Sequence, residues 1–210
     1  MKKAFIIVDL QNDFCHGGSL AVPDANAVIP VINQLQPYFD LIIATKDWHP
    51  QDHTSFATNH PGYKVGDVVT VDAIPQVLWP CHCIQNTPGS DFHVQLDTSK
   101  INKIIFKGAD KAIDSYSAFF DNAHRRETGL KDYLHDRHVD ELYLAGLATD
   151  YCVKYTALDA LALGYRVNII EDACRGVALH PGDIAKAIEE MQAAGANIIQ
   201  SKQVLLRSFC

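Results

Sequence analysis

The loop that follows the apolar run at residues 40–45 carries a carboxylate and two imidazoles. It reads Asp47-Trp48-His49-Pro50-Gln51-Asp52-His53. In an extended segment the side chains at positions i and i+2 point the same way, so Asp47 and His49 can converge on one ion. A mixed oxygen and nitrogen ligand set suits zinc, iron or manganese and does not select among them. The alternative is a solvated turn rich in His and Asp, and the loop alone does not separate the two interpretations.

A candidate nucleophile lies further along the chain. Cys152 follows Gly146-Leu147-Ala148-Thr149-Asp150-Tyr151 at the predicted start of a helix. The free N–H groups at a helix start lower a thiol pKa and can also bind an oxyanion, which is where an acyl-transfer nucleophile would be placed. The competing interpretation is a small core residue, the commoner role of a free cysteine.

Two further charged residues each end a predicted strand. Asp9 follows the run Phe5-Ile6-Ile7-Val8, where a carboxylate is costly unless it is paired or catalytic. Lys107 ends the segment at residues 103–107 and either is solvated or points into a cleft. In the second case Asp9, Lys107 and Cys152 would supply a proton carrier, a cation and a nucleophile, which suffice for covalent attack on a carbonyl.

His82 lies between two cysteines, Cys81 and Cys83. Alternation along an extended chain sends His82 one way and both cysteines the other. We therefore expect His82 to join Asp47 and His49 as a metal ligand, and the cysteines to pack. The aromatic residues beside these motifs could form the walls of a site for a flat aromatic ligand: Phe14, Trp79 and Tyr116. The other histidines are expected to be surface or capping groups: His16, His60, His93, His124, His135, His138 and His180.

Short apolar runs alternate with helix-length amphipathic segments. Strands are predicted at residues 4–10, 41–46, 103–107, 141–146, 166–170 and 196–199, and helices at residues 26–39, 118–136, 151–163 and 181–194. Continuous apolar runs indicate strands buried on both faces, as in parallel sheets. The pattern predicts a three-layer α/β/α domain with a mostly parallel sheet of about six strands.

In such folds the site lies beyond the carboxyl ends of the strands. Asp9, Asp47, Lys107 and the segment at residues 146–149 all fall at such ends. The region at about residues 48–100 is rich in Pro, Gly, Asp and His and too long for an ordinary connection, so we expect it to hold the metal and the substrate. One domain is expected over residues 1–210.

Composition excludes several classes of protein. A formal net charge of −7 argues against a nucleic-acid partner. No segment has the roughly 18 apolar residues of a membrane span. The apolar run near the start is too short for a signal peptide, so the 6 cysteines are expected to be reduced thiols in a cytoplasmic protein.

Taken together, these motifs resemble the nicotinamidase/pyrazinamidase family of isochorismatase-like cysteine hydrolases. The resemblance runs from residue 3 to about 205 through five motifs in order: Asp9-Leu10-Gln11-Asn12-Asp13-Phe14, Asp47-Trp48-His49-Pro50, Trp79-Pro80-Cys81-His82-Cys83, Lys107-Gly108 and Gly146-Leu147-Ala148-Thr149-Asp150-Tyr151-Cys152-Val153. It implies a Rossmann-like fold and metal-dependent hydrolysis of nicotinamide to nicotinic acid and ammonia, through a thioester, in the salvage of NAD. Pyrazinamide shares the ring nitrogen and the carboxamide and is expected to be a second substrate.

The resemblance also assigns residue roles. It implies a triad of Asp9, Lys107 and Cys152, an oxyanion hole from the N–H groups of Ala148 and Cys152, and a cis peptide bond near Ala148–Thr149. One divalent ion, zinc before iron or manganese, would be held by Asp47, His49 and His82, with His53 at the family's variable fourth position. The aromatic walls would be Phe14 and Trp79, with Tyr116 as a further member. Relatives occur both as monomers and as larger assemblies, so a homo-oligomer is compatible with the resemblance.

Three other functions are alternatives. A related cysteine amidohydrolase could act on a carbamoyl or ureido substrate, although some of those enzymes lack a metal. A vinyl ether hydrolase of the isochorismatase type does not need the thiol of Cys152. A non-catalytic metal-binding protein of the same fold would be expected to have lost a triad member, and all three are present.

Overall fold

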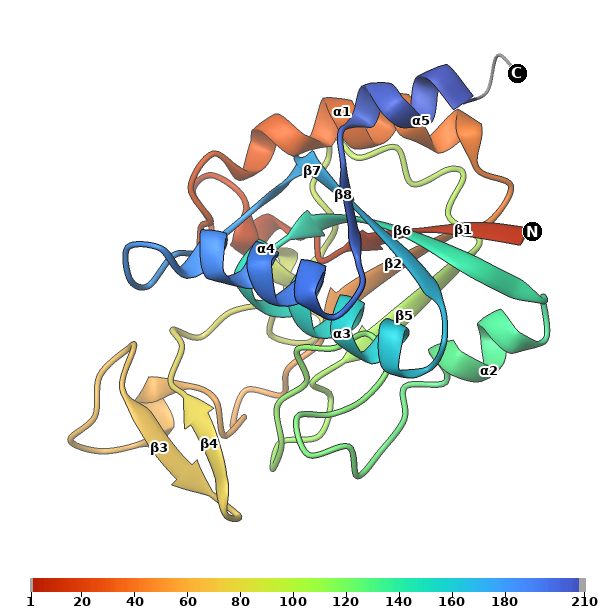
Figure 1. Ribbon diagram of the computed structural model, residues 1–210. Coiled ribbons are helices and arrows are strands. Elements are labelled where there is room, and N and C mark those ends of the chain that lie inside the picture. The colour runs from red at the N-terminus through yellow and green to blue at the C-terminus, as the bar shows by residue number, and fades with distance from the viewer. Residues whose placement is uncertain (1, 208–210) are drawn as a thin grey trace.

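The apolar runs of the sequence pair into one six-stranded parallel sheet in the computed structural model, which describes residues 2–207 (Figure 1). Met1 and residues 208–210 lie outside the described residues, and with them Cys210, one of the expected free thiols. In spatial order the strands are β5 (Lys103–Lys107), β2 (Ile42–Asp47), β1 (Lys2–Val8), β6 (Val139–Leu147), β7 (Arg166–Arg175) and β8 (Asn197–Ile199). All six predicted strands are therefore present, and every pairing among them is parallel.

Alternate residues of the strands build a separate core on each face of the sheet. Phe5 and Ile7 of β1 belong to one core, whereas Ile6 and Val8 belong to the other. Helices α1 (Val28–Leu35) and α5 (Ser201–Arg207) cover the first face, and α2 (Leu130–His135), α3 (Lys154–Ala162) and α4 (Asp183–Ala193) cover the second. This is the predicted three-layer α/β/α arrangement, and burial on both faces explains the continuous apolar runs.

Strand β1 is the point at which the strand order reverses. From β1 the chain adds β2 and β5 on one side, and then β6, β7 and β8 on the other. The connections at the carboxyl ends of β1, β2 and β6 therefore diverge and leave a crevice, the usual place for a ligand in an open parallel sheet.

The long segment between β2 and β5 is ordered against the carboxyl ends of the strands. Its hairpin, β3 (Val68–Val71) and β4 (Ile74–Val77), stands away from the main sheet (Figure 1). The turn residues Asp72 and Ala73 both have positive φ, +48° and +65°, as a two-residue hairpin of this hand requires. This hairpin was not predicted, because its turn lacks the usual glycine.

The helix predicted at residues 118–136 is wrong over most of its length. Only Leu130–His135 is helical. The preceding residues form a loop that folds back on itself, in which Thr128 N–H donates to Phe119 O at 3.0 Å and Asp121 N–H donates to Arg126 O at 3.2 Å. The Asp121 carboxylate accepts bonds from the backbone N–H groups of Ala123 and Arg125, which offers the chain an alternative to helical bonding.

Other boundaries differ less. Strand β7 runs five residues beyond its predicted end, and α5 was not predicted. Across residues 2–207, none of the helices combines the length and the apolar character needed to cross a membrane.

Candidate active site

Asp9, Lys107 and Cys152 meet at the carboxyl ends of β1, β5 and β6. The Lys107 ammonium lies 2.8 Å from Asp9 Oδ2 and 3.2 Å from Cys152 Sγ, and it also donates to Ser115 O at 3.2 Å. Asp9 is fully buried just past β1, with φ +48°, and Thr45 Oγ1 donates to its Oδ1 at 2.5 Å. The three side chains predicted from separate strand ends are thus in direct contact through the lysine.

Lys107 also forms a hydrogen-bonded ion pair with Asp47 Oδ1. Burial alone would lower the pKa of Lys107, but the Asp47 and Asp9 carboxylates outweigh it and raise that pKa well above its usual value. The same lysine helps to hold the pKa of Asp47 well below its usual range against the effect of burial. Lys107 is therefore a permanent cation shared between two carboxylates.

Cys152 differs from the sequence expectation of a lowered thiol pKa. Burial raises its pKa well above the usual value, and the nearby cation of Lys107 only partly opposes this. Burial likewise raises the pKa of Asp9, with Lys107 acting in the opposite direction. A raised pKa favours the thiol over the thiolate, so activation of Cys152 needs a base close by. Cys152 Sγ and a carboxylate oxygen of Asp9 lie within 4.8 Å of each other.

A π-helical turn, Thr149–Val153, carries Cys152 from the end of β6 into α3. The turn is fixed by Ala148 O, which accepts bonds from the N–H groups of Tyr151 and Val153, both at 3.1 Å. A cis peptide bond joins Leu147 to Ala148, one bond earlier than the sequence analysis expected. Ala148 and Cys152 both line the same cavity.

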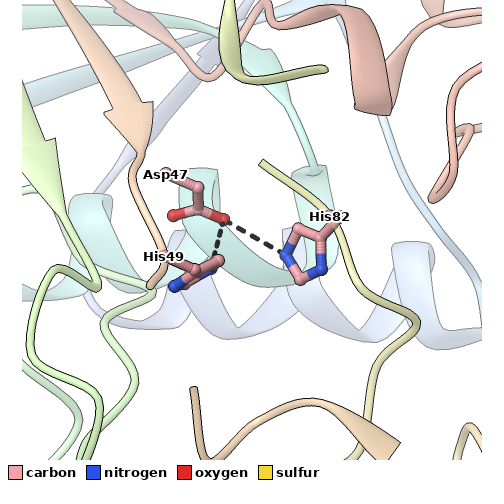
Figure 2. A group of neighbouring side chains, drawn as sticks. All are labelled: Asp47, His49 and His82. Atoms are coloured by element: carbon pink, nitrogen blue, oxygen red, sulfur yellow. Dashed lines mark ion pairs between the residues drawn. The ribbon is translucent and has the colours of Figure 1, made fainter. Parts of the chain in front are cut away.

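The side chains of Asp47, His49 and His82 point toward one another (Figure 2). Asp47 Oδ2 lies 3.5 Å from His49 Nε2 and 3.7 Å from His82 Nε2. His49 Nδ1 is 2.9 Å from Gly108 O, and His82 Nδ1 is 2.8 Å from Pro80 O. A carbonyl can only accept, so each Nδ1 carries the proton and each Nε2 presents a lone pair to the centre of the group.

These residues fit a metal ion. His49 Nε2 is buried and has no hydrogen-bond partner, which is costly for a polar atom unless a ligand occupies the space in front of it. Two neutral imidazole nitrogens and one carboxylate oxygen form a set that zinc accepts with a further position open. Asp47 offers one oxygen to this set and the other to Lys107, so it links the candidate metal group of Asp47, His49 and His82 to the candidate triad of Asp9, Lys107 and Cys152.

His53 lies behind His49, with the ring centroids 4.2 Å apart. Its Nδ1 is 2.7 Å from Ser55 Oγ and its Nε2 is 3.3 Å from Ile113 O. It groups with His49 and Asp114 rather than with Asp47 and His82. Burial lowers the pKa of His53 to about 4. A role as fourth ligand stays a prediction.

A small cavity with a volume of about 30 Å³ lies in front of Cys152. The three predicted wall residues, Phe14, Trp79 and Tyr116, all line it. Trp79 Nε1 donates to Tyr116 Oη at 3.2 Å, which fixes the orientation of both rings. Asp47 and His82 also face the cavity, so its apolar walls end at the metal group.

Sequence reasoning missed four residues of the lining, namely Leu20, Asp114, Tyr151 and Val177. Asp114 is 3% exposed and accepts bonds from Gln76 Nε2 and from Ser115 N–H. Tyr151 is adjacent to Cys152 and could have been singled out for that reason, whereas nothing local marks the other three. The seven other histidines are exposed or half-buried, and none lines this cavity. The prediction that both cysteines beside His82 pack is confirmed for Cys83, which is buried, and only in part for Cys81, which is half-buried.

Comparison with known proteins agrees with this geometry. Residues 3–203 match the isochorismatase domain family. The nicotinamidase of Escherichia coli is 50% identical over 200 residues, covering 93% of each chain. A solved nicotinamidase/pyrazinamidase of Acinetobacter baumannii superposes with a TM-score of 0.94 at 46% identity, covering 97% of this chain and 98% of the other. A pyrazinamidase of Pyrococcus horikoshii, solved in complex with zinc, has a TM-score of 0.78 at 37% identity, covering 95% and 99%. The chain therefore belongs to the nicotinamidase/pyrazinamidase family of isochorismatase-domain hydrolases.

Proposed function

We propose that this protein is a nicotinamidase that hydrolyses nicotinamide to nicotinic acid and ammonia through a thioester on Cys152. The observation that carries the proposal is the contact of Lys107 with Asp9, Cys152 and Asp47, because it places a thiol, a base and a metal-binding group around one aromatic cavity. Pyrazinamide has the same carboxamide and a nitrogen at the same ring position, so it is a second substrate. The reaction serves the salvage of NAD.

The first half of the reaction forms the thioester. Asp9 takes the proton of Cys152 while Lys107 stabilises the resulting thiolate, which attacks the carboxamide carbon. The N–H groups of Ala148 and Cys152 bind the oxyanion, and one such donor lowers a barrier by about 3 kcal/mol. Asp9 then gives its proton to the departing ammonia.

The second half returns the enzyme to its resting state. Asp9, now ionised, removes a proton from a water molecule, which attacks the thioester carbon. The C–S bond breaks, the proton held by Asp9 returns to Cys152, and nicotinic acid leaves and gives up its remaining proton to water. Lys107 keeps its charge throughout, since the two adjacent carboxylates raise its pKa.

Asp47, His49 and His82 would hold one divalent ion, zinc before iron or manganese. When bound there, the ion supplies a Lewis acid for the ring nitrogen, directly or through a water ligand. The zinc complex of the Pyrococcus horikoshii relative supports this choice of metal. Phe14, Trp79 and Tyr116 offer flat surfaces against which the pyridine ring packs, and the hydrogen bond between Trp79 and Tyr116 orients two of them.

The other functions weighed from the sequence fit less well. A carbamoyl or ureido substrate has no use for aromatic walls that end at a metal group. A non-catalytic role leaves the buried contact of Asp9, Lys107 and Cys152 without purpose. A cytoplasmic location and assembly into a homo-oligomer stay predictions.

The test is ammonia release by purified protein whose metal has been identified by elemental analysis. Nicotinamide and pyrazinamide are expected to be hydrolysed, whereas benzamide, which lacks the ring nitrogen, is turned over far more slowly. Cys152→Ala should lower the rate by more than about 10³-fold. Cys174→Ala, which removes another buried thiol outside the cavity, should keep it. No release from folded, metal-loaded protein would retire the nicotinamide assignment and favour carbamoyl or ureido substrates.

A further inference from the structure

The carboxylate of Asp150 joins the turn that carries Cys152 to the segment that follows β7. Its Oδ1 accepts a hydrogen bond from Val177 N–H at 2.9 Å, and its Oδ2 accepts one from Ala178 N–H at 2.8 Å. Asp150 is only 4% exposed, so water does not compete for these bonds. Neither the triad nor the metal group includes Asp150.

Residues 176–178 pack closely against the Asp150 carboxylate. At Gly176, a Cβ atom would meet Asp150 Oδ1 at 3.0 Å and Ile184 Cγ1 at 2.5 Å, so the backbone here has no room for a side chain. Ala178 has φ +52°, a conformation that a non-glycine residue keeps only when its surroundings hold it there. At this position Ala178 N–H donates to the Asp150 carboxylate.

Val177, between these two residues, lines the substrate cavity together with Leu20 and Phe14. The side chain of Val177 therefore forms part of a wall, while its N–H is tied to the residue two positions before the nucleophile. The turn itself does not depend on this tie, because Ala148 O independently binds the N–H groups of Tyr151 and Val153.

We propose that Asp150 is a positioning residue that fixes the Val177 wall of the cavity at a set distance from Cys152. This wall selects flat, six-membered aromatic carboxamides by packing against the ring. The choice of substrate class rests on the proposed function. The two hydrogen bonds from Val177 N–H and Ala178 N–H to the Asp150 carboxylate, called the clamp below, depend only on the geometry of residues 150 and 176–178.

Asp150→Asn tests the clamp with little change in shape. The amide keeps one acceptor oxygen but turns an NH₂ group toward the other backbone donor, so one bond is lost and two donors face each other. We expect the KM for nicotinamide to rise about tenfold, as the loss of one hydrogen bond to a charged acceptor suggests, with kcat within about threefold of wild type. Val177→Ala, which removes the wall but keeps the clamp, should raise KM in the same way.

The matched control is Asp172→Asn. Asp172 also binds a backbone segment, accepting from Ser201 N–H at 2.7 Å and from Ser201 Oγ at 2.6 Å, but it lies outside the cavity. This variant should leave KM unchanged. Hydrogen exchange at residues 176–178 should become faster in Asp150→Asn and remain slow in Val177→Ala and Asp172→Asn.

A readout without substrate separates this proposal from the proposed function. The rates at which iodoacetamide and the bulkier N-phenylmaleimide label Cys152 give a size preference, which should weaken in Asp150→Asn and in Val177→Ala even if nicotinamide is not the substrate. The proposal is overturned if exchange becomes faster while both KM and the size preference stay as in wild type. It is also overturned if Asp150→Asn lowers kcat with KM unchanged, since Asp150 would then act on the chemistry rather than on the wall.

Discussion

At the scale of single residues, the electrostatics of the site depend on Lys107. Its ammonium is buried between the carboxylates of Asp9 and Asp47, so Lys107→Met leaves two buried carboxylates without a cation. Removing one partner of a buried ion pair typically costs about 3–5 kcal/mol, and we expect a loss of that size in the free energy of unfolding, measured by urea titration. Lys111→Met is the control, because Lys111 is 67% exposed and pairs with an equally exposed Asp52, so its loss should change stability by less than about 0.5 kcal/mol. Equal stability of the two variants would show that the site does not require the buried charge.

At the scale of elements, the ends of the strands determine where the ligands point. Gly108, directly after β5, has φ +63°, its carbonyl orients His49, and a Cβ atom there would overlap the His49 ring. Gly108→Ala should therefore weaken zinc binding at least tenfold, or about 1.4 kcal/mol, in a chelator competition titration. Gly164→Ala places alanine at a similar positive φ of +89° with open space around it, so it carries the left-handed strain of about 1–2 kcal/mol without touching a ligand. A similar zinc affinity in both variants would contradict the role of Gly108.

At the scale of the whole molecule, folding brings the metal group together, because His82 is 33 positions from His49 along the chain. Zinc should therefore bind the folded protein in preference to the unfolded chain. At a free concentration 100 times its dissociation constant, zinc should add about 2.7 kcal/mol to the free energy of unfolding. This corresponds to a rise in Tm of about 5–10 °C between chelated and zinc-loaded protein, measured by calorimetry. His82→Ala should lose this rise, and His135→Ala, at an exposed site, should keep it. An undiminished rise in His82→Ala would place the ion elsewhere.

One domain over residues 1–210 stays a prediction, which the two cores shared by a single sheet support.

Much of the fold followed from local pattern. An apolar run that ends in a charged residue indicates both a buried strand and its carboxyl end. This pattern predicted that Asp9, Asp47 and Lys107 lie at the carboxyl ends of parallel strands. The failed helix at residues 118–129 shows the limit of such patterns. There the Asp121 side chain bonds to nearby backbone N–H groups and competes with helical bonding.

The sequence by itself determined the parallel three-layer fold, and it singled out side chains that the structure brings together: Asp9, Lys107 and Cys152 beside Asp47, His49 and His82. These depend on residue type and on short-range order, which one chain displays directly. Only the tertiary structure decided that Lys107 is shared between Asp9 and Asp47, that burial raises the pKa of the Cys152 thiol, and that Asp114 and Val177 face the cavity. Each of these depends on burial and on contacts between residues far apart in the chain, which local spacing does not encode.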